Sequence, residues 1–181
     1  MKIALVGPIY PYRGGIAHHT YFLDAALQQI DCQTQVISFA RQYPAWLYPG
    51  KTDKDPSQKT PPANVSYILD PFYPWTWLQA ARKLFDLNPD LVILQWWTTF
   101  WSLPFTFIVR YLKHRRIPVV YIIHNVIPHE ARPWDARLAR LALSKADALL
   151  AQTRQEKEKL LAILPNAIVD TCPIPMYRLP V

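Results

Sequence analysis

The chain has 181 residues, of which 51% are hydrophobic and 18% are charged. This length is enough for one large domain or two small ones with a sizeable core, and the composition excludes a disordered chain. The formal net charge of +7 favours an anionic partner, which would be a nucleic acid, an acidic membrane surface or a phosphorylated ligand.

The sequence also bears on compartment and partners. Cys32 and Cys172 lie far apart without metal-ligand spacing, which favours a reducing compartment. The first residues lack the basic and apolar regions of a signal peptide. Zinc spacing, RNP-like aromatics and a helix-turn-helix pattern are all missing, which argues against nucleic acid. We expect a cytoplasmic protein with no metal site, and peripheral attachment to the inner face of the membrane is an option.

The N-terminal segment predicts a strand, a loop rich in glycine and proline, and a helix. The helix, at 16–30, would place Ile16, Thr20, Leu23, Leu27 and Ile30 on one face. A helix N-terminus preceded by glycines can bind an anion. Its first N–H groups have no partner within the helix and its dipole favours negative charge, while glycine has no Cβ to keep the anion away from the backbone. Gly14–Gly15 is not the dinucleotide fingerprint, and a tight turn that needs positive φ explains it equally well.

The remaining elements alternate between strand and helix. The pattern predicts a long loop and a helix of solvated Glu/Lys pairs at 154–164. It also predicts an α/β fold in the form of a Rossmann-like parallel sheet with helices on both faces, spanning 1–170. The expected strands lie at 35–39, 65–69, 90–95, 117–123, 146–151 and 167–170, the other helices at 74–87, 100–112 and 134–144, and the loop at 41–62.

The run 91–109 contains no charged residue, which raises the question of a membrane span. Polar residues interrupt it, so a buried strand, an aromatic loop and a core helix explain it better. An interfacial role for Trp96, Trp97, Phe100 and Trp101 is the alternative. The basic run 110–116 complements a helix C-terminus, or forms a patch for anionic lipids. In the loop, Tyr43, Trp46, Leu47 and Tyr48 either form a contact surface or fold back on the domain.

Polar residues follow several of the predicted strands. Open α/β sheets bind ligands beyond the carboxyl ends of their strands. We therefore expect Gly14–Gly15, Gln95, His124–Asn125 and Gln152–Thr153 to meet at one edge. A nicotinamide enzyme would want an acidic residue after the second strand, and 39–41 supplies none.

Several motifs stand out when they are taken in order: Gly14-Gly15-Ile16, Asn88-Pro89-Asp90, the block 120–125 with Pro128-His129-Glu130, Ala146-Asp147-Ala148, and 173–177. Together they resemble the N-terminal domain of retaining GT-B glycosyltransferases of the group 1, or family 4, type. The resemblance implies two Rossmann-like domains with the active site in the cleft between them. The N-terminal domain would bind the acceptor, and a C-terminal domain would hold the nucleotide-sugar through a paired-glutamate motif.

The paired-glutamate motif is not found in this sequence. We therefore expect the donor-binding domain to lie elsewhere, with 171–181 as a linker towards it, and this chain alone to be inactive. The resemblance implies no metal or cofactor besides the nucleotide-sugar. Asp24 and Glu130 are candidate nucleophiles by residue type alone. His18 and His19 are expected to be structural or peripheral.

The resemblance also assigns roles by position. It implies that His124 is catalytic, that Gly14 and Gly15 face the donor diphosphate, and that Tyr10, Tyr12, Arg13, Gln95 and Asn125 border the acceptor. The expected function is acceptor binding in a glycosyltransferase that moves a sugar from a nucleotide-sugar to a lipid-linked or polysaccharide acceptor. Exposed tryptophans and the basic run would serve a membrane surface. The alternative is a non-catalytic Rossmann-like module that binds another phosphate ligand.

Overall fold

The computed structural model describes residues 1–44, 52–57, 60–128 and 132–174. Its centre is a seven-stranded parallel sheet with the strand order β3-β2-β1-β4-β5-β6-β7. The strands are β1 (Lys2–Val6), β2 (Gln33–Phe39), β3 (Val65–Leu69), β4 (Leu91–Trp96), β5 (Val119–Ile123), β6 (Ala148–Ala151) and β7 (Val169–Thr171). The Rossmann-like parallel sheet predicted from the alternation of elements is confirmed.

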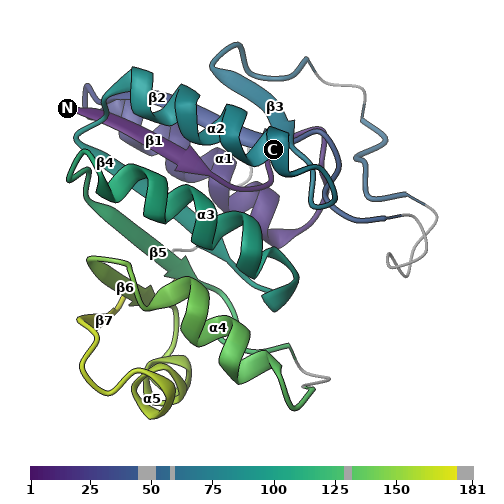
Figure 1. Ribbon diagram of the computed structural model, residues 1–181. Helices are drawn as coiled ribbons and strands as arrows, with labels where there is room; N and C mark the ends of the chain where they lie inside the picture. Colours follow the sequence, from purple (N-terminus) through teal and green to yellow (C-terminus); the bar gives the residue numbers. More distant parts are fainter. Residues whose placement is uncertain (45–51, 58–59, 129–131, 175–181) are drawn as a thin grey trace.

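Helices cover both faces of this sheet. They are α1 (Gly15–Gln29), α2 (Pro74–Leu87), α3 (Ser102–Lys113), α4 (Asp135–Leu143) and α5 (Arg154–Ile163), with a short 3-10 helix η1 (Thr99–Trp101) before α3. Figure 1 shows α2, α3 and α4 in front of the sheet and α1 behind it. The right-handed crossover rule explains this split, because β1 to β2 runs in the opposite direction across the sheet from β3 to β4 and onward.

The sequence explains where several helices begin and end. Pro74 is the first residue of α2, where its missing N–H costs nothing, and Asn88 ends that helix in the left-handed conformation at φ 45°. Thr153 caps α5, because its side chain accepts a hydrogen bond from the Glu156 N–H. The predicted face of α1 is only partly correct. Thr20 is buried, but Ile30 is 68% exposed because α1 ends one residue earlier.

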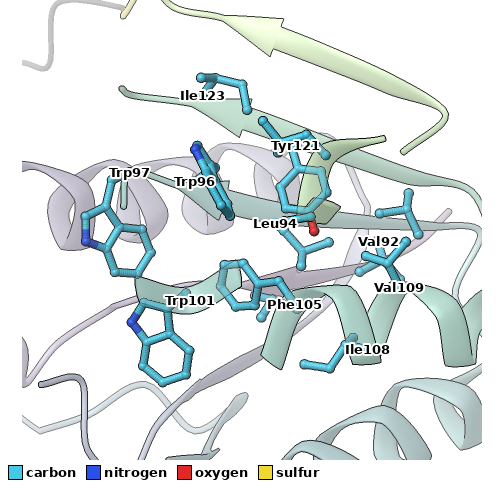
Figure 2. Close-up of a cluster of buried hydrophobic side chains, with 14 of the residues drawn as sticks. Val92, Leu94, Trp96, Trp97, Trp101, Phe105, Ile108, Val109, Tyr121 and Ile123 are labelled. Carbon is cyan, nitrogen blue, oxygen red and sulfur yellow. The ribbon is translucent and has the colours of Figure 1, made fainter. Parts of the chain in front are cut away.

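The uncharged run 91–109 forms β4, η1 and most of α3, as predicted. Within the described ranges, every helix is too short or too polar to cross a bilayer. Figure 2 shows how the run packs, with Trp96, Trp101 and Phe105 among the buried side chains between β4 and α3. The Trp101 and Phe105 rings stack with centroids 5.8 Å apart.

The interfacial role considered for these tryptophans is wrong. Trp96 and Trp101 are fully buried and Trp97 is 8% exposed. The indole N–H of Trp96 donates to the Val126 carbonyl at 3.1 Å, and that of Trp97 donates to the Tyr43 hydroxyl. These side chains therefore build the core rather than a membrane contact.

The long loop folds back on the domain where it is described. Tyr43 is half-buried, and its ring lies 5.9 Å from that of Phe100. Lys54 forms an antiparallel bridge with Tyr12, and its Nζ lies 3.2 Å from the centre of the Tyr12 ring. The predictions for Trp46, Leu47 and Tyr48 fall outside the described residues, as do those for His129, Glu130 and 175–181.

Candidate functional site

The site lies where the strand order reverses, between β1 and β4. Loops from neighbouring strands diverge at such a point, and they leave a crevice beyond the carboxyl ends of the strands. The chain segments that follow β1, β4, β5 and β6 bring their polar residues to this edge. The predicted meeting of Gln95 with His124 is confirmed, because the Gln95 Oε1 lies 2.6 Å from the His124 Nε2.

Gln95 stands between two histidines and is fully buried. Because an amide oxygen can only accept, this arrangement requires that the His124 Nε2 carries the proton. On its other side, the Gln95 Nε2 lies 3.3 Å from the His19 Nδ1, which must accept. The two imidazole rings meet edge to face with centroids 5.0 Å apart. One amide therefore fixes the tautomers of two neutral histidines.

Burial keeps these histidines neutral. It lowers the pKa of His124 to about 4 from its usual 6.5, and the charge of His19 lowers it further. A hydrogen bond with the Gln152 side chain raises the His124 pKa by a smaller amount. Burial also lowers the pKa of His19. At neutral pH both rings are therefore uncharged hydrogen-bonding groups.

Gly7 allows this close packing at the end of β1. A Cβ built there would lie 2.6 Å from the Gln95 Cγ and 3.3 Å from the Thr20 Oγ1. Real Cβ atoms do not come that close, so any side chain at position 7 would push Gln95 out of place. The glycine is needed here for space rather than for a special φ.

Gly7→Ala is expected to lower the free energy of unfolding by about 1–3 kcal/mol, because the added methyl overpacks the Gln95 side chain. Urea denaturation would measure the loss. Gly15→Ala is the matched control, since a Cβ at position 15 meets nothing within 4 Å. Equal stabilities for the two variants would contradict the packing explanation.

The N-terminus of α1 is open to an anion. Gly14 has φ +116° and Gly15 begins the helix; both are exposed, and a Cβ at either would meet nothing within 4 Å. Among described side chains none caps this end, and the first turn holds no acidic residue. The first N–H groups of a helix have no partner within it. The predicted anion site is thus exposed, and the positive φ of the tight-turn explanation is also present at Gly14.

A carboxylate on α5 holds the loop after β5 in place. The Glu156 Oε2 accepts a hydrogen bond from the Val126 N–H at 2.6 Å, and its Oε1 pairs with the Lys159 Nζ at 2.6 Å. Glu156 is only 8% exposed, so the prediction that the paired charges of α5 form a solvated face is wrong at this position. This carboxylate anchors the segment that carries His124 and Asn125, which are half-buried at the sheet edge.

Glu156→Ala is expected to cost about 2–3 kcal/mol of unfolding free energy, because the Val126 N–H would be buried without an acceptor. The control is Glu158→Ala on the same helix, whose carboxylate is exposed and pairs with Arg154 at the surface. That control is expected to change stability by less than about 0.5 kcal/mol. Equal losses of stability for the two variants in thermal unfolding would contradict the anchoring role.

Gln152 adds a second amide to the same edge, and its side chain hydrogen-bonds His124. It is 7% exposed, and its Nε2 is buried without a hydrogen-bond partner among the described residues. A buried amide N–H without an acceptor is uncommon in folded proteins, and such groups gather where a ligand supplies the partner. The sequence placed Gln152 at this edge but assigned it no role.

The loop residues predicted to border the acceptor are divided. Arg13 is exposed and Tyr10 is half-buried, with its carbonyl accepting from the Tyr67 hydroxyl. Tyr12 is 1% exposed and donates its hydroxyl to the Phe39 carbonyl at 2.7 Å. Its side chain supports the loop from inside, a position that does not favour the predicted acceptor contact.

His19 is the residue that sequence reasoning placed elsewhere. It is 8% exposed and contacts both Gln95 and His124, whereas His18 is exposed. Its position one turn after Gly15 was the available signal, since a helix residue four places on returns to the same face. Asp24 is not part of the site. Its carboxylate holds the Asn64 and Gln28 side chains instead.

Comparison with known proteins agrees with this geometry. A family model described as a glycosyl transferase 4-like domain matches residues 14–175. An alpha-glucosyltransferase solved in complex with UDP superimposes with a TM-score of 0.64 at 11% identity, covering 97% of this chain and 44% of that one. No curated protein sequence matches the chain.

Two further structures share the fold. MurG of Acinetobacter baumannii has a TM-score of 0.56 at 14% identity, over 98% of this chain and 46% of that one. UDP-GlcNAc 2-epimerase from Methanocaldococcus jannaschii has a TM-score of 0.58 at 15% identity, over 90% and 42%. The chain spans less than half the length of these structures and corresponds to one half of a GT-B fold. Because the family model covers most of its length, the chain belongs to the glycosyl transferase 4-like domain family.

Proposed function

We propose that this chain is the acceptor-binding, N-terminal domain of a glycosyltransferase that moves a sugar from a nucleotide-sugar to a lipid-linked or polysaccharide acceptor. The observation that carries the proposal is the pairing of an open helix N-terminus with the buried His19–Gln95–His124 group at the switch point. One feature suits a departing diphosphate and the other suits a sugar hydroxyl.

The glycine end of α1 would stabilise the leaving group. Its N–H groups and the positive end of the helix dipole favour the charge that develops on the diphosphate as the glycosidic bond forms. No reorganisation is needed, since the helix already holds these donors in place. Support comes from the structural neighbour that was solved with UDP. We propose that no metal is required for this step.

His124 would act on the acceptor side. Its Nε2 is engaged by Gln95, and the ring also hydrogen-bonds the Gln152 side chain, so a substrate hydroxyl would compete with Gln152 for the remaining ring nitrogen, Nδ1. A neutral ring with a fixed tautomer binds such a hydroxyl without competition from its own protonation. The Gln152 Nε2 and the Asn125 side chain would complete the acceptor contacts.

The donor-binding domain is the proposed partner. The test begins with the intact mass of the native protein, which shows whether that domain belongs to the same polypeptide or to a second chain. The native protein or complex is then assayed with a panel of nucleotide-sugars and membrane-extracted acceptors. Transfer supports the proposal. Phosphate-ligand binding without transfer from any donor would overturn it in favour of a binding module.

Gly15→Asp is expected to raise the KM for the nucleotide-sugar at least tenfold in the complete glycosyltransferase, because a carboxylate at the helix end repels the diphosphate. The fold should be unharmed, since position 15 has open space around it and an acidic residue favours a helix N-terminus. Unfolding and donor kinetics measured together separate the two effects. An unchanged KM would contradict the assignment of Gly14 and Gly15.

A further inference from the structure

The outward surfaces of α2, α3 and α4 carry exposed apolar side chains. Trp75 is 63% exposed, Leu103 is 56%, Phe107 is 38%, and Trp134, just before α4, is 52%. Leu103 and Phe107 lie one turn apart on the same side of α3, opposite its buried residues. These three helices form one layer in front of the sheet (Figure 1). We call their outward surface the α2–α4 face.

The same face is strongly basic. Its exposed cations are Arg82 and Lys83 on α2, Arg110 on α3, and Arg137 and Arg140 on α4. The one exposed acid on the three helices is Asp86, since Asp135 is buried and accepts from the Arg132 N–H at 2.7 Å. On the opposite side of the sheet, α1 has no lysine or arginine. The positive charge is therefore concentrated on one side of the domain.

Apolar and basic groups meet in a hollow between the helices. Its volume is about 490 Å³, and its lining includes Trp77, Leu103, Phe107, Arg110, His114 and Leu141. Scattered exposed apolar residues are ordinary on a protein surface, but here Leu103 and Phe107 line this hollow beside Arg110, and Trp75 lines a second hollow with Arg82 and Lys83. This pattern is typical of a surface that lies in a membrane interface.

The apolar end of the face adjoins the candidate site. Helices in this fold run opposite to the strands, so their N-termini lie at the carboxyl edge of the sheet. Trp75, Leu103 and Trp134 stand at or beside the first turns of α2, α3 and α4, and His124 follows β5 at that edge. Arg110 and Arg140 occupy the last turns, farther from the site.

We infer that the α2–α4 face docks on a bilayer with anionic lipid head groups, with its apolar side chains inserted beside the cleft. Aromatic and aliphatic tips gain by leaving water at the interface, and each basic residue gains at a negative surface. Duplex nucleic acid would use the cations but would leave Leu103 and Phe107 exposed. The inference rests on the proposed function in one respect, because it favours the lipid-linked class of acceptor.

The test is vesicle sedimentation of the full chain with no nucleotide-sugar present. Phosphatidylcholine vesicles containing phosphatidylglycerol should bind the protein, pure phosphatidylcholine vesicles should not, and raised salt should release it. R110Q/R137Q should weaken binding about 25-fold, since each basic residue contributes roughly fivefold at such a surface. The matched control is R154Q/K157Q on α5, where acidic neighbours already pair with both cations.

A second pair of variants tests the apolar contribution. Leu103→Ser should lower binding to the mixed vesicles severalfold, whereas Ile30→Ser, at a residue 68% exposed behind the sheet, should not. Both positions are exposed, so neither change threatens folding. Equal effects within either pair would overturn the inference. So would binding to both vesicle types alike, or complete release from the vesicles by duplex DNA.

These results are separable from the proposed function. Vesicle binding by a protein that transfers no sugar would leave the docking face standing and overturn the glycosyltransferase. Transfer to a soluble acceptor by a protein that ignores anionic vesicles would overturn only the docking face.

Discussion

His124→Ala in the complete glycosyltransferase is expected to lower kcat by about 10²-fold, because the ring that positions the acceptor hydroxyl is lost. The ring lies at the carboxyl edge of β5, and its proton position is fixed by the Gln95 amide. A methyl group offers neither the lone pair nor the hydrogen bond. Donor affinity should change little, since the helix end at Gly14 and Gly15 is untouched. Single-turnover kinetics with saturating donor would measure the loss.

Two companion variants show whether the loss of kcat comes from the His124 side chain and its orientation or from a general change in structure. His18→Ala changes an exposed neighbour on α1 and should leave kcat within about twofold. Gln95→Leu keeps similar volume but removes both hydrogen bonds, so it frees the tautomer of His124 and should lower kcat with His124 still present. A normal kcat in His124→Ala would remove this histidine from the mechanism.

The fold could be predicted because its strands and helices differ clearly in pattern. β4 is a continuous apolar run, as expected for a parallel strand covered on both faces, and α2 begins at Pro74 and ends before a proline. The predicted strand positions agree with the observed ones to within a few residues. The meeting of Gln95 and His124 followed in turn, because the carboxyl ends of parallel strands share one edge.

Side-chain direction was harder to predict than position. His19 faces the sheet because of how α1 is rotated about its axis, and the sequence does not fix that rotation when polar and apolar residues mix on one face. For the tryptophans of the β4–α3 segment, too, the position in the chain was predicted but the side-chain direction was left open. Trp96 is the last residue of β4 and Trp97 follows the strand, and both side chains pack in the same core cluster.

Glu156 is a second residue whose position the sequence did not predict. Its sequence context, a capped helix with i,i+3 and i,i+4 pairs, is that of a solvated surface. The structure brings the loop after β5 against this helix, and the carboxylate then meets the Val126 N–H. Such long-range partners depend on how two crossovers pack. They leave no signal in the spacing of either segment.

The second large effect is a loss of stability in mild acid. The folded chain keeps His124 neutral with a pKa of about 4, whereas the unfolded chain protonates it near 6.5. Between these values the unfolded state binds more protons, so the free energy of unfolding falls as the pH is lowered through this window. The stabilising contribution is complete above pH 6.5 and amounts to roughly 3 kcal/mol. Its loss would be complete below about pH 4.

Urea denaturation across this pH range, compared between the native chain and His124→Asn, isolates the histidine from the carboxylates that titrate nearby. The native chain should lose more stability than the variant as the pH falls, and His114→Asn, at an exposed position after α3, should behave like the native chain. Parallel curves for all three would contradict a buried neutral His124. The edge-to-face contact with His19 sharpens the expectation, since burial lowers the pKa of that ring too and a proton on either disfavours one on the other.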